Sequence, residues 1–290
     1  MDTLQTYLVN DAKAILLVVH GSGEHIGRYR HVAVWLNKHH ISMVGGDLPG
    51  LGRSKEKRGH IQDFANYLHK IDQWFQYIKK NWPEKPTFLL GHSMGGLIVL
   101  RYLEELKDSQ ALKGVIVTSP AVSISIEVPK WQRILAENLV KVWPTMRLNS
   151  GITASQVSRD PKVVKAYAED PLVYNKVSIA WFLAFQKAIE LVWEKKDQIS
   201  RSGIPLLYLQ AGEDQLVDPQ KAKEFVEGFS KEQVQFHLID GLYHEILNEP
   251  EKEIYLQLIT DWMSKNRVSY IFIKLLYGTI LKPIGLFMSY

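Results

Sequence analysis

The chain of 290 residues contains no cysteine, which excludes a disulfide framework and any metal site built on thiolates. The first residues also lack the basic segment and apolar run of a secretory signal. We therefore expect a cytoplasmic protein without disulfides.

The chain also has little net charge and no recognisable metal-binding motif. The formal net charge is only +4, and the basic residues are spread along the chain without a dense stripe, so we expect no nucleic-acid partner. No His-Glu-x-x-His motif or compact cluster of histidine and aspartate is visible, and we expect neither a metal nor a cofactor.

Short apolar runs, typical of strands buried on both faces, are the first feature present. Helical patterns lie between them, for example over residues 64–82. This alternation predicts the α/β class, with a mostly parallel central sheet flanked by helices. The strand-like runs are residues 14–20, 42–45, 87–90, 112–118 and 205–210.

The alternation stops after residue 120 and resumes near residue 204. Amphipathic helical segments fill the interval, with the apolar residues of 131–143 on one side. We therefore predict a core formed by residues 1–120 and 204–267, a helical cap or lid inserted at 121–203, and an apolar tail at 268–290.

The strongest motif is Gly-x-Ser-x-Gly at residues 91–95, between an apolar strand and an apolar helix. This is the pattern of a nucleophile elbow, in which glycines let a strained serine sit between a strand and a helix. Ser93 is the predicted nucleophile. The N–H of Met94, at the start of the helix, is a candidate oxyanion donor.

A second oxyanion donor is needed from the end of an earlier strand, and the small residues around Ser22 fit this requirement. The spacing of Gly21, Gly23 and Gly27, without Gly-Lys-Ser/Thr, excludes a phosphate-binding loop. A plain structural turn is the alternative.

A serine nucleophile needs a histidine base and an orienting carboxylate, in the chain order Ser, acid, His for this fold. Asp214 follows a predicted strand and is the favoured acid; Glu213 and Asp218 are alternatives. Asp218 precedes Pro219 and a helical pattern over 220–229, which is typical of an N-cap.

His244, in a loop after the last predicted strand, is the predicted general base among the ten histidines. His237 falls within that strand, and His92 lies within the elbow. His39 and His40 lie in a polar turn, where surface or structural roles are more common.

Together, these motifs resemble the monoacylglycerol lipase and lysophospholipase branch of the α/β-hydrolases, with bacterial phospholipases most similar. The resemblance rests on residues 20–29, 46–54, 91–96 and 119–120, on two cap motifs at 158–159 and 170–172, and on 243–245. It implies the α/β-hydrolase fold, a triad of Ser93, Asp214 and His244, and oxyanion donors at Ser22 and Met94.

In that branch the cap forms an apolar acyl tunnel above the serine. Trp131, Leu135 and Trp181 of the cap are therefore candidate substrate contacts, with cap helices simply packed on the sheet as the alternative. Arg28 and Leu247, outside the cap, are further candidate contacts. Monoglyceride lipases can use a polar residue just after the catalytic histidine to hold glycerol; Ile246 and Leu247 occur here, which leaves lysophospholipids open.

The predicted reaction is hydrolysis of the carboxylic ester of a single-chain glycerolipid, a monoacylglycerol or a lysophospholipid, through an acyl-enzyme. Because fold and triad do not set the leaving group, a short-chain carboxylesterase or an aminopeptidase is an alternative. A non-catalytic, membrane-attached binding module is a more remote one.

The tail at 268–290 is unusually apolar for a chain end, but Lys274, Lys282 and Pro283 interrupt it. These residues argue against a spanning helix and favour an interfacial anchor on the inner face of the membrane. Packing on the cap or on a second subunit is the alternative, and the sequence predicts no oligomeric state.

This tail hypothesis predicts that a chain ending at Arg267 binds anionic liposomes more weakly than the full chain, because the apolar anchor is removed. Co-sedimentation of both chains with the same liposomes measures the difference. Equal binding would show that the tail is not the anchor.

Overall fold

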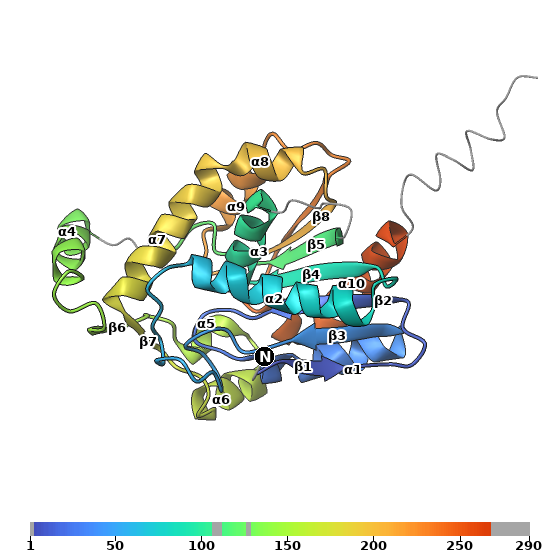
Figure 1. The fold of residues 1–290 in the computed structure, drawn as a ribbon, viewed down its shortest axis with the longest axis horizontal. Coiled ribbons are helices and arrows are strands. Elements are labelled where there is room, and N and C mark those ends of the chain that lie inside the picture. Colours follow the sequence, from blue (N-terminus) through green and yellow to red (C-terminus); the bar gives the residue numbers. More distant parts are fainter. Residues whose placement is uncertain (1–2, 106–111, 126–128, 268–290) are drawn as a thin grey trace, which may run out of the picture.

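The computed structural model describes residues 3–105, 112–125 and 129–267; the apolar tail at 268–290 lies outside them. Seven strands form the central sheet, in the order β1-β3-β2-β4-β5-β8-β9, and all neighbours except β1 and β3 are parallel (Figure 1). The predicted α/β-hydrolase fold is confirmed. The strands are β1 Gln5–Tyr7, β2 Ala14–Val19, β3 Ile41–Gly45, β4 Thr87–His92, β5 Leu112–Thr118, β8 Leu206–Ala211 and β9 Val234–Ile239.

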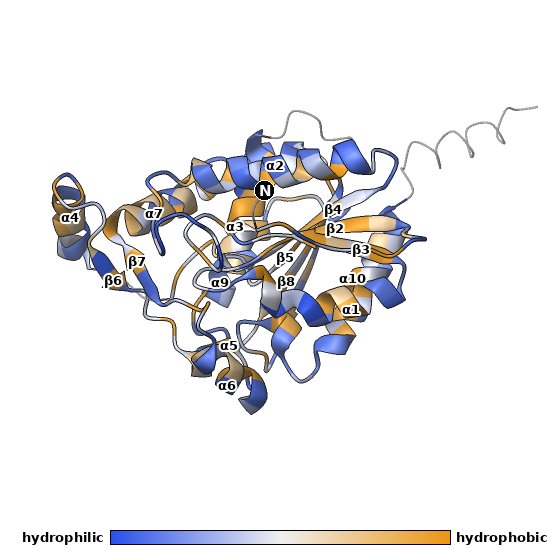
Figure 2. Cartoon of the chain, turned by 60° about the horizontal axis from the view of Figure 1, so that its bottom comes forward, coloured by the Kyte–Doolittle hydropathy of each residue, from blue (hydrophilic) through white to orange (hydrophobic). Residues whose placement is uncertain are grey.

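The central strands are apolar throughout because both of their faces are covered. In β2, Ile15, Leu17 and Val19 join one buried cluster, and the alternate residues join another on the opposite face. Helices α2, α3 and α9 supply the first cluster, while α1 and α10 supply the second. Figure 2 shows the hydrophobic sheet between these helices. Their bounds are α1 Arg30–Lys38, α2 Ala65–Asn81, α3 Met94–Glu105, α9 Pro219–Val226 and α10 Lys252–Asn266.

Between β5 and β8 the chain leaves the sheet and forms five helices and a two-stranded ribbon, β6–β7, in the part that the structure describes. We call this segment the insert. Its helix α7 packs against both α3 and α4, and α4 projects at one end of the molecule (Figure 1). The bounds 121–203 for a cap stay a prediction. The insert contains α4 Lys130–Leu139, β6 Arg147–Asn149, α5 Ala154–Val157, α6 Pro161–Glu169, β7 Lys176–Ser178, α7 Ile179–Glu194 and α8 Lys196–Arg201.

The apolar side expected over residues 131–143 is largely exposed. Trp131 is 64% exposed, and Val142 and Trp143, just beyond α4, are 81% and 60% exposed. The alternative in which these side chains pack on the sheet therefore does not hold for them.

Three strands were absent from the sequence prediction. β1, β6 and β7 are three residues long, which is too short for a recognisable apolar period. The helix expected over 220–229 starts at Pro219 with Asp218 as its N-cap, as predicted, but ends at Val226, before Gly228 at φ +91°. In the described ranges no helix is both long and apolar enough to cross a membrane.

Candidate active site

Ser93 occupies the turn between β4 and α3, with a left-handed backbone at φ +53°. Its N–H donates to the carbonyl of Thr118 at 3.0 Å, and its own carbonyl accepts from Ala121 and Leu97. A non-glycine residue in this region is strained and persists only where its surroundings hold it. These bonds hold the serine at the carboxyl end of the central strands, where ligands bind in open α/β sheets.

The glycines that flank Ser93 are required by close backbone approach. A Cβ added at Gly95 would lie 2.1 Å from the carbonyl oxygen of Val19 in β2, and one added at Gly91 would lie 2.4 Å from that of Gly95. Neither contact can be relieved by moving a side chain. Close backbone packing therefore explains why both positions are glycine, as the motif predicts.

His244 and Asp214 come from the two loops that follow β9 and β8, and they meet in the buried interior. Nδ1 of His244 lies 2.7 Å from Oδ2 of Asp214. Burial raises the pKa of Asp214, but the His244 partner outweighs this effect and the net pKa is lowered. The ionised carboxylate therefore accepts the Nδ1 proton, which leaves Nε2 of His244 as the basic nitrogen.

The structure distinguishes Asp214 from the two alternative acids. Oδ1 of Asp214 accepts from the N–H groups of Leu216 and Val217 at 2.9 and 3.0 Å, which orients the carboxylate toward His244. Glu213 is exposed, and Asp218 accepts from Gln220 as the N-cap of α9. Only Asp214 is paired with His244. The imidazole of His92, which follows Gly91 in the elbow, packs 4.8 Å from that of His244 between ring centroids.

The loop around Ser22 is held by a buried glutamate that the sequence analysis overlooked. Oε1 of Glu24 accepts from the N–H of Gly21 at 2.6 Å and from the hydroxyl of Tyr29 at 2.7 Å. Burial acts to raise the pKa of Glu24, but Arg28 and nearby histidines outweigh it and lower the pKa to about 2. The ionised carboxylate fixes the turn that carries the Ser22 N–H.

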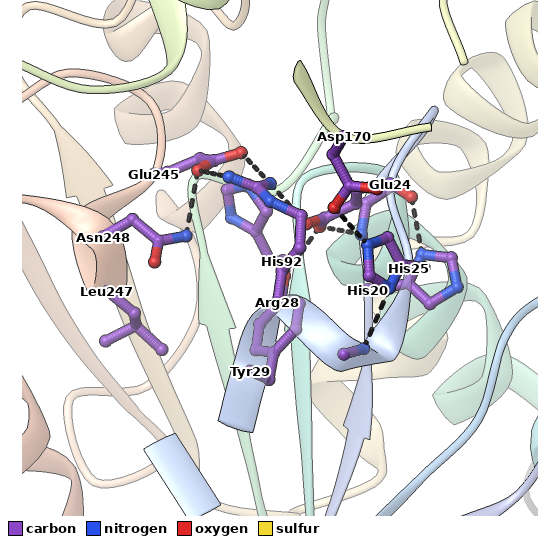
Figure 3. Close-up of polar contacts among 12 residues, drawn as sticks. His20, Glu24, His25, Arg28, Tyr29, His92, Asp170, Glu245, Leu247 and Asn248 are labelled. Carbon is purple, nitrogen blue, oxygen red and sulfur yellow. Dashed lines mark hydrogen bonds and ion pairs between the residues drawn. The ribbon is translucent and has the colours of Figure 1, made fainter. Parts of the chain in front are cut away.

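Arg28, expected as a substrate contact, instead joins two buried carboxylates. Its Nη1 lies 2.7 Å from Glu24, and its two terminal nitrogens lie 2.6 and 2.7 Å from Glu245 (Figure 3). The guanidinium also stacks 4.8 Å from the ring centroid of Tyr167 in α6. Glu245, the sequence neighbour of His244, is thus linked through Arg28 to the loop around Ser22 and to Tyr167 of the insert.

Leu247 also lies outside the lining of the cavity next to Ser93. It is buried in the cluster formed by α1 and α10, and its carbonyl accepts from His31 at 2.7 Å. Ile246 belongs to the same cluster. Because Glu245 is bound to Arg28 and the next two residues are core, the positions after His244 carry no information on a headgroup.

A cavity of about 580 Å³ opens above Ser93 and is lined mainly by the insert. Ser22, Ser93 and Met94 lie along it, as do the predicted contacts Trp131, Leu135 and Trp181, whereas Arg28 and Leu247 do not. The described residues that line it include no charged side chain. The roles of Ser22 and Met94 as donors, and of the triad, stay predictions.

No group of three or more histidine, aspartate or glutamate side chains suited to a metal ion occurs within the described residues.

Residues 10–251 match the family described as serine aminopeptidase, S33. The chain belongs to this family. A phospholipase, YtpA of Bacillus subtilis (strain 168), is 33% identical over 248 residues, covering 86% of this chain and 94% of the relative. A monoacylglycerol lipase of Mycolicibacterium smegmatis is 30% identical, covering 87% and 89%. The crystal structure of a monoacylglycerol lipase from Paleococcus ferrophilus superposes with a TM-score of 0.81 at 30% identity, covering 91% of this chain and 98% of the other.

The pKa of His244 allows a test of its predicted role as the general base in this member of the S33 family. Burial lowers it, but Asp214 and nearby glutamates raise it above 6.5 overall. Activity should therefore fall as the pH drops through the raised pKa, because protonated His244 cannot accept a proton from Ser93. Asp214→Asn removes the main raising influence, so the acid limb of kcat/KM should move to lower pH and the rate should fall about 10⁴-fold.

The pH profile of a water-soluble ester measures both effects. Asp218→Asn keeps the N-cap of α9 and should leave the acid limb in place. An unchanged limb in Asp214→Asn would assign the titration to another group.

Arg28→Met tests the buried ion cluster. It would leave Glu24 and Glu245 without their counter-charge, so the free energy of unfolding should fall by about 3–5 kcal/mol. Arg133 also pairs with two glutamates, but its side chain is 43% exposed, and Arg133→Met should cost about 1 kcal/mol or less. Chemical denaturation of both variants measures the difference; equal losses would contradict the assignment.

Proposed function

We propose that the chain is a carboxylic ester hydrolase that cleaves single-chain glycerolipids through an acyl-enzyme. The observation that carries this proposal is the apolar cavity above Ser93, whose lining includes no charged side chain in the described part of the chain. The relatives named phospholipase and monoacylglycerol lipase, each at least 30% identical, support the same class.

In this proposal the hydroxyl of Ser93 attacks the ester carbonyl while Nε2 of His244 accepts its proton. The oxyanion is stabilised by the N–H groups of Ser22 and Met94, and the buried Asp214 holds the imidazole in the useful tautomer. His244 then protonates the leaving alcohol. In the second half of the reaction it activates a water that releases the fatty acid.

The cavity suits an acyl chain in both volume and chemistry. Its volume lies within the range of pockets that bury most of a ligand of moderate size. Trp181 and Phe185 of α7 stack at 4.9 Å between ring centroids and form part of its wall. An acyl chain that leaves water for this surface gains about 0.8 kcal/mol for each buried CH₂ group.

The alternatives make other demands on the site. An aminopeptidase needs a buried carboxylate for the ammonium of its substrate, and no described lining residue provides one. A short-chain ester would leave most of the apolar cavity unfilled. A binding module needs no paired His244 and Asp214 beside a strained serine, yet both features are present.

The test is a substrate panel: a long-chain monoacylglycerol, a lysophosphatidylcholine and a butyrate ester that dissolves in water. Long-chain glycerolipids should have the highest kcat/KM, since each buried CH₂ stabilises the bound state. Ser93→Ala should abolish both turnover and labelling by a fluorophosphonate probe, with the wild-type chain as the reference.

Preference for the butyrate ester would favour the short-chain alternative. Failure of the wild-type Ser93 to react with the probe would favour the binding module.

A further inference from the structure

Four cationic side chains gather on the ribbon β6–β7 and on the loop beside it. Arg147 lies in β6 and Lys176 in β7; Lys57 and Arg58 come from the loop that follows Gly50. The loop is docked on the ribbon, because the N–H of Ser178 donates to the carbonyl of Gly59 at 2.8 Å. We call Lys57, Arg58, Arg147 and Lys176 the basic cluster.

The two arginines are held by neutral partners. The guanidinium carbons of Arg58 and Arg147 lie 4.6 and 5.8 Å from the ring centroid of Tyr174. Arg58 donates to the carbonyl of Pro171 at 2.6 Å, and Arg147 donates to the carbonyl of Arg58. Such contacts fix the guanidinium planes and leave their charges uncompensated.

Four other arginines of this chain are neutralised in place. Arg28, Arg101, Arg133 and Arg159 each form an ion pair with at least one glutamate. No ion pair joins a residue of the basic cluster to a carboxylate within the ranges that the structure describes. The cluster therefore presents fixed positive charge to a partner outside the molecule.

Exposed apolar side chains lie close in sequence to this charge and at the same end of the molecule. Val142 and Trp143, just beyond α4, precede Arg147 by only a few residues. The connection is short and fixed, because the carbonyls of Pro144 and Met146 accept from α7 at 3.1 and 3.0 Å. Figure 2 shows α4, β6 and β7 at the same end of the molecule.

The cavity opens at this same end. Trp131 and Leu135 of α4 are at least half exposed, yet both also line the cavity. On the ribbon, Leu148 and the opposite Val177 line the cavity as well, while the cationic Arg147 and Lys176 do not. Basic side chains thus lie on the ribbon beside the apolar cavity without lining it.

We propose that this end of the molecule docks on an anionic phospholipid surface, with the basic cluster at the lipid phosphates and Val142 and Trp143 in the interface. The inference rests on the proposed function, because a lipid substrate would then pass from the membrane into the cavity. Charge complementarity selects the partner: cations next to a bilayer favour anionic lipids, and aromatic and aliphatic side chains favour the headgroup region.

Vesicle binding by the full chain tests the proposal. Lys57→Gln/Lys176→Gln removes two exposed charges without touching the arginines that hold the loop. Near an anionic surface each lysine contributes about fivefold to binding, so the double variant should bind phosphatidylglycerol vesicles roughly 30-fold more weakly. The matched control is Lys80→Gln/Lys223→Gln, which removes two exposed charges from α2 and α9 and should bind like the wild type.

Wild-type binding should also weaken with added salt and be much weaker to phosphatidylcholine vesicles. Equal losses in the two double variants, or equal wild-type binding to both kinds of vesicle, would overturn the proposal. A changed oligomeric state of Lys57→Gln/Lys176→Gln in sedimentation velocity would overturn it too, by assigning the surface to a second copy of the chain. The tail at 268–290 is present in every variant, so its contribution is the same in both double variants and in the wild type.

Turnover of the water-soluble butyrate ester separates this inference from the proposed function. It should be unchanged in both double variants, because the basic cluster lies outside the cavity. Normal vesicle binding by a wild-type chain that cleaves no lipid ester would contradict the proposed function alone. Lipid turnover by a chain that does not prefer anionic vesicles would contradict the docking surface alone.

Discussion

One guanidinium ties together the two loops that meet beside Ser93. Arg28 binds Glu24, which orients the turn around Ser22, and it binds Glu245, which directly follows His244. The Arg28 and Glu245 side chains are 217 positions apart in sequence and almost fully buried. A buried charge without its partner is costly, so each carboxylate constrains the loop that carries it. The spacing between the loop around Ser22 and the loop that carries His244 is therefore fixed by buried ion pairs within the chain itself.

The same carboxylates act electrostatically on His244, the predicted base. Burial alone would lower the pKa of His244, but Asp214, Glu245 and Glu24 together raise it. Negative charge behind the imidazole stabilises the imidazolium that forms when His244 accepts a proton, and the low local dielectric strengthens this interaction. The cavity side of Ser93 is lined by uncharged residues in the described ranges. The carboxylates thus lie on the His244 side of Ser93, and the apolar surface lies on its cavity side.

Local patterns predicted most of the fold and the turn that carries Ser93. The strands buried on both faces, the elbow at Ser93 and the N-cap at Asp218 each depend on residues close in sequence. Arg28 was assigned to the substrate because a sequence cannot show which distant carboxylate a guanidinium meets. The same limit hid the support that Glu24 gives to the Ser22 turn and the packing of His92 on His244. Tertiary contacts decide these roles.

The helix α4 shows the same limit in hydrophobic patterning. An amphipathic period indicates that one side of a helix is apolar. It does not indicate whether that side packs against a protein core or against a lipid surface. For α1, α2, α3, α9 and α10, the central sheet covers that side. For α4 the side chains remain exposed, and the basic cluster that begins at Arg147 lies just beyond them. The sequence does not show that Lys57 and Arg58 lie near α4, because they reach this end of the molecule through the packing of their loop on the ribbon. The apolar pattern and the charges are therefore related only in the folded structure.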